Sequence, residues 1–512
     1  MKNIKYLLLS AILVVFTACS DDEYDYTPDA KPLPELTAGS ADFSKYVAVG
    51  ASFTAGYTDG AVFIASQTNS FPNILNKEFS NAGGGTFTQP LMKDNIGGLL
   101  FSSNQIANPR LFFNGTGPEL LAATPTTEVT SVLSGPFNNM GVPGAKSFHF
   151  VAPGYGNLAG VPAGKANPYF ARMATSGTTT VIGDAVAQSP TFFTLSEVGG
   201  NDVLAYATSG GTGEYQLGNM DPSTYGGNDI TDPVVFAAAF EGAVGALTSN
   251  GAKGVVTNVP YITSLSHFTT VPHNPVPLDA TTAGYLNSAA AYGAYNAGIQ
   301  QAFAYLVSVN VVTPAAAELE ITKRTITFSA APNNAVVIMD EDLTDLTGIN
   351  PALVSMRQAT ADDLLVLPAM AFIGTKADPN NPLSINGVAI PLADKWVLTP
   401  EEQLNIKTAT DLYNQTIEAV ANQYDLAIVD FKSILQTAST TGYTDSKYTF
   451  TTKLVTGGLV SLDGIHLTSR GYAVMANAFL KAIDAKYGSN FVAAGVTANA
   501  GDYPTNYNEG FR

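Results

Sequence analysis

The stretch Val-Ala-Val-Gly-Ala-Ser-Phe-Thr-Ala-Gly (residues 47–56) decides the fold. Tyr46–Val49 is a short apolar run that ends at Gly50, a pattern typical of a buried parallel strand that leads into a sharp turn. Ser52 follows at the carboxyl end of this expected strand, and open α/β sheets bind their ligands at that edge. The stretch therefore predicts one strand of a parallel sheet and a candidate functional serine directly after it.

Further apolar runs alternate with helical segments along the chain. Strands are expected at 191–198, 254–259 and 426–429, and helices at 184–188, 233–249 and 471–487. Another helix is expected to begin at the capping box Thr399-Pro400-Glu401-Glu402, because proline is favoured at the first helical position. The alternation predicts an α/β fold, a three-layer sandwich with a central parallel sheet flanked by helices.

Three long stretches do not follow the alternation, namely residues 82–135, 203–230 and 262–395. We interpret them as insertions into one α/β domain spanning residues 41–512. Within the last insertion, Thr325–Phe328 and Ala335–Met339 flank a Pro-Asn-Asn turn, which predicts a hairpin. The apolar run Leu364–Phe372 has two interpretations, a cap over the acyl chain of a substrate or a buried strand.

The N-terminal segment 1–18 has the features of a secretory signal peptide, with two lysines, a short apolar run and small residues before Cys19. Cys19 is the only cysteine of the chain, which excludes an internal disulfide. Phe16-Thr17-Ala18-Cys19 resembles the lipobox of bacterial lipoproteins, and this resemblance implies that Cys19 is lipidated. The alternative is an ordinary signal peptide with an incidental cysteine.

Residues 19–40 are acidic and rich in proline, and such a composition predicts a flexible tether. The acidic cluster directly after Cys19 resembles the surface-export signal of Bacteroidetes lipoproteins. It implies an outer-membrane lipoprotein that is exposed at the cell surface and held to the membrane by its lipid anchor. The formal net charge of −18 argues against nucleic acid as a partner.

Four short segments carry residue types that suit nucleophilic catalysis. They are Gly50-Ala51-Ser52, Asn139-Met140-Gly141-Val142-Pro143-Gly144-Ala145, Gly199-Gly200-Asn201-Asp202 and Asp463-Gly464-Ile465-His466. In this order, each next to the end of an expected element, they resemble the conserved blocks of the SGNH/GDSL hydrolase family. The resemblance implies the flavodoxin-like fold of that family and hydrolysis of esters. Ala51 departs from the family pattern, which has aspartate before the serine.

The resemblance implies a role for each matching residue. Ser52 is the nucleophile, His466 the general base and Asp463 the residue that orients the imidazole. Imidazole suits the role of base because it can accept and return a proton near neutral pH. The oxyanion hole is expected to combine the backbone N–H groups of Ser52 and Gly144 with the side-chain amide of Asn201.

The expected function is cleavage of carboxylic esters, either lipid acyl or carbohydrate acetyl esters, through an acyl-enzyme on Ser52. The alternative is a surface lipoprotein that keeps this fold for binding and has lost catalysis. No cofactor and no metal are expected, because His149, His267 and His273 have no carboxylate or cysteine at metal-ligand spacing. The expected partners are an ester substrate and the membrane that holds the lipid anchor.

Overall fold

The computed structural model describes residues 32–512, and Leu36–Arg512 form one compact unit. Cys19, the expected signal peptide and most of the expected tether lie outside the described residues. The end of the expected tether belongs to the compact unit, since the backbone N–H of Thr37 donates to Asn490 Oδ1 at 2.7 Å and that of Ser40 to the Tyr487 carbonyl at 2.8 Å. Within residues 32–512, no helix combines the length and the apolar character of a membrane span.

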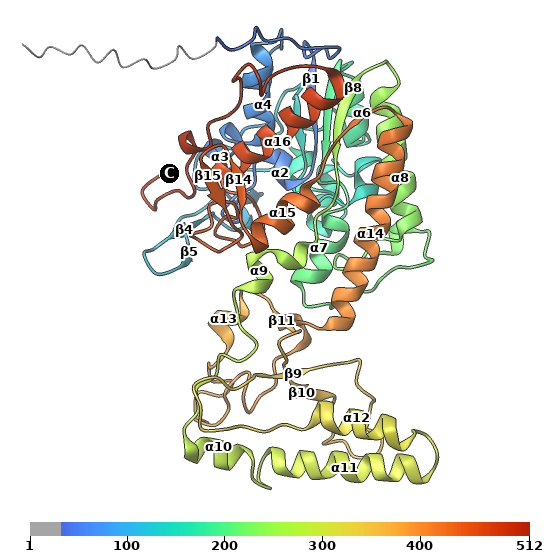
Figure 1. Cartoon of the computed structure of the whole chain (residues 1–512), viewed down its shortest axis with the longest axis vertical. Coiled ribbons are helices and arrows are strands. Elements are labelled where there is room, and N and C mark those ends of the chain that lie inside the picture. Colours follow the sequence, from blue (N-terminus) through green and yellow to red (C-terminus); the bar gives the residue numbers. More distant parts are fainter. Residues whose placement is uncertain (1–31) are drawn as a thin grey trace, which may run out of the picture. The chain divides into compact units, whose positions relative to one another are not determined.

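The centre of the compact unit is a parallel sheet of five strands (Figure 1). Its strands are β1 (Tyr46–Gly50), β6 (Asn139–Gly141), β7 (Phe192–Ser196), β8 (Lys253–Thr257) and β13 (Ala427–Val429). They lie in the order β13-β8-β7-β1-β6, so the direction of strand succession reverses between β1 and β7. In doubly wound sheets, ligands bind at the carboxyl ends of the strands where this reversal occurs.

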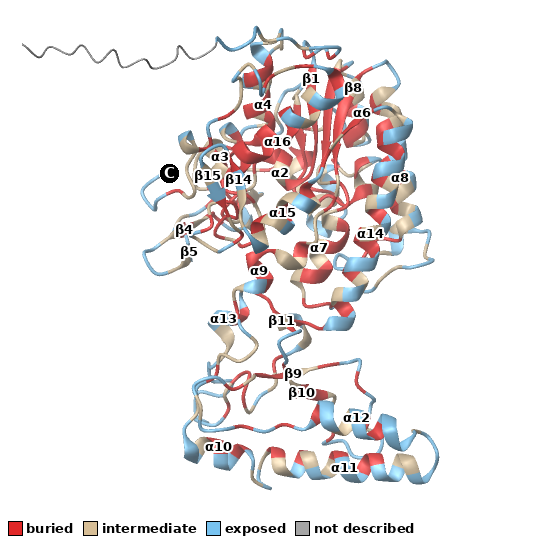
Figure 2. Ribbon diagram, in the orientation of Figure 1, coloured by how far each residue is buried: buried red, intermediate tan, exposed pale blue. Residues whose placement is uncertain are grey.

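Helices cover both faces of the sheet, as the alternation predicted. One face carries α4 (Phe71–Ser80) and α16 (Ser469–Tyr487), which pack against each other (Figure 1). The other face carries α6 (Val181–Val186), α8 (Pro233–Thr248) and α14 (Pro400–Gln423). Figure 2 shows that the strands and the inward sides of these helices are buried. Burial of this apolar surface is the main contribution to the stability of the fold.

The helix predicted from the capping box begins where expected. The Thr399 side chain accepts from the Glu402 backbone N–H, and the Glu402 carboxylate accepts from the backbone N–H of Thr399 at 2.6 Å. Pro400 stands at the first helical position, where no intrahelical partner is needed for its nitrogen. Ile406, Ala409 and Tyr413 then recur on one face and are buried against the body.

Short helices follow two of the strands at the carboxyl edge of the sheet. They are α2 (Ser52–Ala55) after β1 and α7 (Asn201–Thr208) after β7. The insertion expected at 203–230 therefore begins only after Thr208, because residues 203–208 belong to helix α7 of the regular alternation. Val203, Tyr206 and Ala207 of α7 are buried in the core, whereas the residues after Thr208 form turns.

The expected insertion 82–135 consists mainly of loops with two small hairpins. β2 (Leu99–Phe101) pairs with β3 (Asn104–Ala107), and β4 (Leu111–Phe113) pairs with β5 (Pro118–Leu120). The remaining α-helices and strands of the body are α3 (Ile64–Thr68), α5 (Pro168–Ala171), α15 (Phe431–Thr440), β14 (Tyr443–Asp445) and β15 (Tyr448–Phe450).

The expected insertion 262–395 carries most of the remaining elements of the chain. They are α9 (Ser266–Thr269), α10 (Ala280–Leu286), α11 (Tyr292–Ser308), α12 (Pro314–Arg324), β9 (Val337–Met339), β10 (Met356–Gln358), β11 (Leu364–Leu365) and α13 (Ala369–Phe372). It is followed by β12 (Val397–Leu398), which pairs with β11 directly before α14. We call residues 271–398 the inserted segment.

The hairpin predicted in the inserted segment is wrong. β9 pairs with β10, some seventeen residues further along, and residues 325–328 form no strand. The backbone N–H groups of residues 326 and 328 donate instead to the side-chain oxygens of Asn296 and Asn287 at 3.0 and 2.9 Å. These side-chain acceptors replace the strand partner that the alternating pattern suggested.

The apolar run Leu364–Phe372 is neither one continuous strand nor a covering cap. Its first two residues form β11, and its last four form α13, because Pro368 stands between them and cannot donate to a strand ladder.

Candidate active site

Ser52 lies at the first position of α2, directly after β1 at the centre of the sheet. The strand must turn sharply there, and Gly50 permits the turn. A Cβ atom at Gly50 would lie 2.1 Å from Thr54 Oγ1 and 2.7 Å from the Ser196 carbonyl oxygen. The Ser52 side chain is mostly buried but lines the wall of a cleft.

His466 and Asp463 reach Ser52 from the other end of the chain. Both lie in a turn that directly precedes α16, and the backbone N–H of Ser461 closes this turn by donating to the His466 carbonyl at 2.7 Å. His466 Nε2 lies 3.0 Å from Ser52 Oγ, and His466 Nδ1 lies 2.8 Å from Asp463 Oδ2. Serine, imidazole and carboxylate thus form one hydrogen-bonded chain.

The Asp463 carboxylate is held by four further hydrogen bonds. Oδ1 accepts from the backbone N–H groups of Ile465 and His466, both at 2.9 Å, and from Ser461 Oγ at 3.0 Å. Oδ2 accepts from the backbone N–H of Gly60 at 3.0 Å. Burial alone would raise the pKa of Asp463, but the adjacent His466 and these backbone donors hold it well below its usual range. Asp463 is therefore a carboxylate at neutral pH.

Aromatic rings fix the imidazole from two sides. The Tyr57 ring lies 4.3 Å from the His466 ring, centroid to centroid, and the Phe53 ring lies 5.8 Å away in an edge-on arrangement. Both aromatic residues follow Ser52 closely in the sequence. The segment that supplies the serine therefore also limits the orientations open to the histidine.

Asn201 and Gly144 follow β7 and β6, which are the two neighbours of β1 in the sheet. Asn201 begins α7, and its Nδ2 donates to the Ala145 carbonyl at 3.0 Å. Asp202 accepts from the backbone N–H of Ser147 at 2.9 Å and from its hydroxyl at 2.7 Å. These contacts hold the loop of Gly144 against the start of α7.

The structure shows the surroundings of two of the three expected oxyanion donors, Asn201 and Gly144. The Asn201 amide uses one N–H on Ala145, and an amide nitrogen carries two. Asn201 lines the same cleft as Ser52, whereas Gly144 lies in the loop after β6 with open space on its Cβ side.

Glu197 is a residue of the site that the motifs did not indicate. It lies directly after β7, and its Oε1 accepts from the backbone N–H of Thr54 at 2.9 Å. Its Oε2 accepts from Ser196 Oγ at 2.8 Å. Ala51, which stands where the family has aspartate, is fully buried in the hydrophobic core and offers no acceptor. An acidic residue between an apolar strand and a glycine turn was the signal that could have found Glu197.

Glu197 is held in an uncommon conformation. Its φ is +50°, a left-handed value that costs a non-glycine residue about 1–3 kcal/mol and that is frequent at functional sites. Its backbone N–H donates to Thr257 Oγ1 at 2.8 Å, which fixes the turn. Burial raises the pKa of Glu197 to about 7, although hydrogen bonds from Thr54 and Ser196 act in the opposite direction.

Asp59 supports the turn of Asp463 and was likewise not predicted. Its backbone N–H donates to Ser461 Oγ at 3.1 Å, and its Oδ1 accepts from the Leu462 backbone N–H at 3.1 Å. Burial raises the pKa of Asp59 to about 7, and the nearby Asp463 acts in the same direction. Asp59 thus connects the segment after Ser52 with the segment before His466.

The cleft beside Ser52 has a volume of about 930 Å³, open solvent included. Ser52, Glu197, Asn201 and His466 lie along it. Its other walls are mainly apolar, and include Leu204, Val259, Ile262, Phe431, Leu435 and Met475. Of the residues expected in the insertion 262–395, only Ile262 and Leu265 line the cleft, and none of the run 364–372 does. The cleft can therefore hold an extended apolar group next to the serine.

The residues around Ser52 come from segments that lie far apart in the sequence. No family model, curated protein or solved structure matches this chain. The function is accordingly inferred from the motifs and from the geometry of their side chains.

The remaining histidines lie outside the hydrogen-bonded chain of Ser52. The His149 ring stacks on Tyr155 at 4.2 Å. His267 is buried, and its backbone N–H donates to the Gly464 carbonyl at 3.0 Å, so it supports the turn of Asp463 through its backbone. The backbone carbonyl of His273 accepts from the Val336 N–H at 3.0 Å within the inserted segment.

Proposed function

We propose that this chain is a serine ester hydrolase of the SGNH/GDSL type, with Ser52 as nucleophile. The observation that carries the proposal is the chain of hydrogen bonds from Ser52 Oγ to His466 Nε2, at 3.0 Å, and from His466 Nδ1 to Asp463 Oδ2, at 2.8 Å. A serine hydroxyl is a weak nucleophile unless a base takes its proton, and this arrangement provides that base and a carboxylate that orients it.

The proposed reaction proceeds through an acyl-enzyme. Ser52 Oγ attacks the ester carbonyl carbon while its proton moves to His466 Nε2. The tetrahedral intermediate collapses, and the alcohol leaves with the proton from His466. Water then attacks the acyl-enzyme carbonyl carbon while its proton moves to His466 Nε2. The acid is released as His466 returns this proton to Ser52 Oγ. Asp463 stabilises the imidazolium in both halves and stays ionised throughout.

The oxyanion is proposed to bind between the ends of β1, β6 and β7. Its donors are the backbone N–H groups of Ser52 and Gly144 and the second N–H of the Asn201 amide. The contacts of Asn201 with Ala145 and of Asp202 with Ser147 support this assignment, because they fix two of the three donor segments relative to each other.

The apolar walls of the cleft favour esters with an acyl chain over acetylated sugars. A sugar ring needs several polar partners, and the side chains around Ser52 supply few outside the proposed catalytic residues. An acyl chain gains about 0.8 kcal/mol for each methylene that leaves water. We therefore propose that the acyl chain of the substrate lies along Leu204, Ile262 and Met475.

The test uses a fluorophosphonate probe and nitrophenyl esters of increasing acyl length. The native protein should be labelled on Ser52 and should hydrolyse medium-chain esters faster than the acetate. Ser52→Ala should lose both labelling and turnover while it keeps the unfolding temperature of the native protein. Absence of labelling in folded native protein would contradict the proposal and favour a binding protein that has lost catalysis.

We also propose that the protein is a surface-exposed outer-membrane lipoprotein anchored through Cys19. The support is the sequence around Cys19, which lies outside the described residues. Growth with an alkyne analogue of palmitate should label the native chain, and Cys19→Ala should remove the label. Protease treatment of intact cells should then degrade the chain if it faces outward.

A further inference from the structure

Three carboxylates from different parts of the chain gather where the inserted segment meets the body. They belong to Glu341, which follows β9, to Asp394, which precedes β12, and to Glu402 in the first turn of α14. One oxygen of each lies within 4.8 Å of the others. Ionised carboxylates at this separation repel one another unless a positive charge or a proton lies between them.

The two inner carboxylates each have an oxygen without a hydrogen-bond partner. Glu402 is only 3% exposed, and its Oε2 accepts from the backbone N–H and the hydroxyl of Thr399, at 2.6 and 2.9 Å. Its Oε1 is buried and has no partner, and the same holds for Asp394 Oδ1. Such groups are costly to bury unless something satisfies them.

A glycine turn makes room for the buried carboxylate. Gly211 follows α7 with a φ of +79°, and a Cβ atom built on it would lie 1.6 Å from Glu402 Oε1. Any other residue would push the carboxylate away from Asp394 and Glu341. The turn therefore places Glu402 Oε1 where the three side chains converge.

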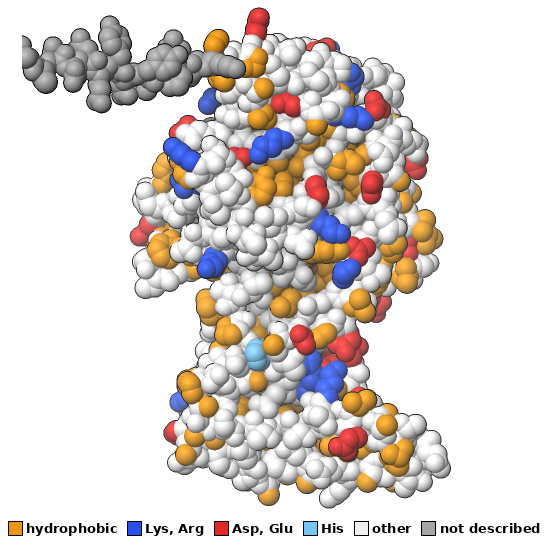
Figure 3. Space-filling view, viewed as in Figure 1, with side chains coloured by type: hydrophobic (Ala, Val, Ile, Leu, Met, Phe, Trp, Pro, Cys, Tyr) orange, Lys and Arg blue, Asp and Glu red, His pale blue; other side chains and the backbone are white. Residues whose placement is uncertain are grey.

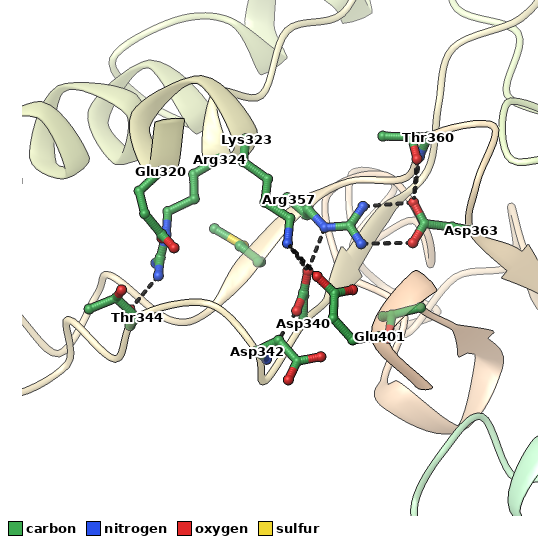
Figure 4. A network of polar contacts seen from close by, with 12 residues as sticks. Glu320, Lys323, Arg324, Asp340, Asp342, Thr344, Arg357, Thr360, Asp363 and Glu401 are labelled. Carbon is green, nitrogen blue, oxygen red and sulfur yellow. Dashed lines mark hydrogen bonds and ion pairs between the residues drawn. The ribbon is translucent and has the colours of Figure 1, made fainter. Parts of the chain in front are cut away.

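Three nearby acidic residues, Asp340, Asp363 and Glu401, are balanced by cations, in contrast to these three. Asp340 pairs with Arg357 Nε at 2.5 Å, Arg357 also pairs with Asp363 at 2.7 Å, and Glu401 lies 3.4 Å from Lys323 Nζ (Figure 4). Figure 3 shows acidic and basic side chains side by side on the surface between the lower end of α14 and α12. Within residues 32–512, Glu341, Asp394 and Glu402 form no ion pair with lysine, arginine or histidine.

We propose that Glu341, Asp394 and Glu402 bind a divalent cation, Ca²⁺ in preference to Mg²⁺, and that this ion joins the inserted segment to the body. Three carboxylates supply only hard oxygen ligands, which suit Ca²⁺ and Mg²⁺ better than Zn²⁺. Ca²⁺ accepts six to eight oxygens in irregular geometry, whereas Mg²⁺ requires a near-ideal octahedron and is usually held by one or two carboxylates. Backbone carbonyls and water would complete the shell.

The sequence did not indicate this site, because its residues lie 53 and 8 positions apart and only the fold brings them together. The proposal is independent of the proposed esterase activity. Glu341 belongs to the inserted segment and Glu402 to a helix that covers the central sheet. Binding of Ca²⁺ should therefore stabilise the attachment of residues 271–398 to the body. The reaction proposed at Ser52 should not require the ion.

The experiment is a Ca²⁺ titration of the full soluble chain, stripped with a chelator, by calorimetry and by thermal unfolding at pH 8. Ca²⁺ should bind with one site per chain and raise the unfolding temperature, and Mg²⁺ should do so more weakly. The variants are Glu341→Gln and Asp394→Asn, which leave the capping role of Glu402 intact. The matched control is Glu401→Gln, an exposed acid on the same helix as Glu402 that pairs with Lys323.

The two test variants should weaken Ca²⁺ binding at least tenfold, whereas the control should bind like the native chain. Without Ca²⁺, Glu341→Gln should unfold at a higher temperature than the native chain, because one repulsive charge is gone. With saturating Ca²⁺ this order should reverse. A native chain that neither binds Ca²⁺ nor gains stability from it would overturn the proposal and indicate that shared protons hold the carboxylates together. Equal affinity in the test variants would also overturn it.

Discussion

The backbone N–H of Thr54 donates a 2.9 Å hydrogen bond to Glu197 Oε1, which ties the helix of Ser52 to the end of the neighbouring strand β7. Ala51 cannot provide such an acceptor from within the helix's own segment. The carboxylate that orders the serine turn therefore comes from the adjacent strand. Because Glu197 also lines the cleft, its loss should shift Ser52, the proposed nucleophile.

Glu197→Ala should lower kcat for a nitrophenyl ester by up to about 100-fold, since a small displacement of a nucleophile has an effect of that size. KM should change little, because the apolar walls of the cleft stay in place. Steady-state kinetics on the purified variants checks this prediction. Glu197→Gln keeps an oxygen acceptor for Thr54 and should restore most of the rate. Equal losses in both variants would instead indicate that the charge of Glu197 matters.

Asp463→Asn should reduce kcat by about 10,000-fold, with the protein still folded. An amide cannot accept from Gly60 and His466 and from the Ser461 turn as a carboxylate does, so the imidazole tautomer is no longer fixed. Kinetics together with far-ultraviolet circular dichroism would measure this. A loss smaller than tenfold would show that Asp463 is not the orienting carboxylate.

Asn201→Ala should lower kcat by about 100–1,000-fold with little change in KM, as expected when one oxyanion donor is lost. Part of the effect arises because the contact with Ala145 is lost as well. Asn201→Asp keeps the size of the side chain without its N–H donors and should be at least as impaired. Turnover numbers for the three proteins decide the point, and a fully active Asn201→Ala would exclude the amide from the oxyanion hole.

Leu204→Trp should shift the acyl preference toward short chains. The larger ring would fill part of the cleft, so hydrolysis of a decanoate ester should fall at least about tenfold while that of an acetate ester is kept. The comparison is a series of nitrophenyl esters assayed under identical conditions. Leu217→Trp is the matched control, because Leu217 is 68% exposed and lies outside the cleft. A parallel loss on all esters would point to general disruption.

Asp59 predicts a pH dependence of stability. Burial raises its pKa from 3.8 to about 7, so the folded chain holds the proton more tightly than the unfolded chain. The associated stability is fully present below about pH 4 and is lost as pH rises toward 7, by at most about 4 kcal/mol at 1.36 kcal/mol per pKa unit. Asp59→Asn mimics the neutral acid and should unfold at higher urea concentration than the native protein at pH 8, with little difference at pH 4.5.

The elements that decide the sheet could be predicted because each carries a local signal. Tyr46–Gly50 and Phe192–Ser196 are apolar runs bounded by glycine, serine or proline, and the capping box at Thr399 marks a helix start. The short strand Asn139–Gly141 was missed as an element, since three residues are too few to show a period. Its residues drew attention only as part of the motif Asn139–Ala145.

The inserted segment was less predictable, because its backbone is satisfied by side chains that lie far away in the sequence. The side-chain oxygens of Asn296 and Asn287 accept from the backbone N–H groups of residues 326 and 328, respectively, in place of the expected hairpin. The residues of the candidate site likewise divide into those with a local sequence signal and those without one. Ser52, Asn201, Asp463 and His466 were found by motif, whereas Glu197 and Asp59 act through contacts that only the fold creates.

The hydrogen bond between Ser52 and His466 spans 414 positions of the chain. During synthesis Ser52 leaves the ribosome early, whereas His466 leaves it only when almost the whole polypeptide has been made. An incomplete chain that lacks His466 therefore leaves the Ser52 hydroxyl without its imidazole partner. The contact between Ser52 and His466 can therefore form only when both ends of the domain have come together.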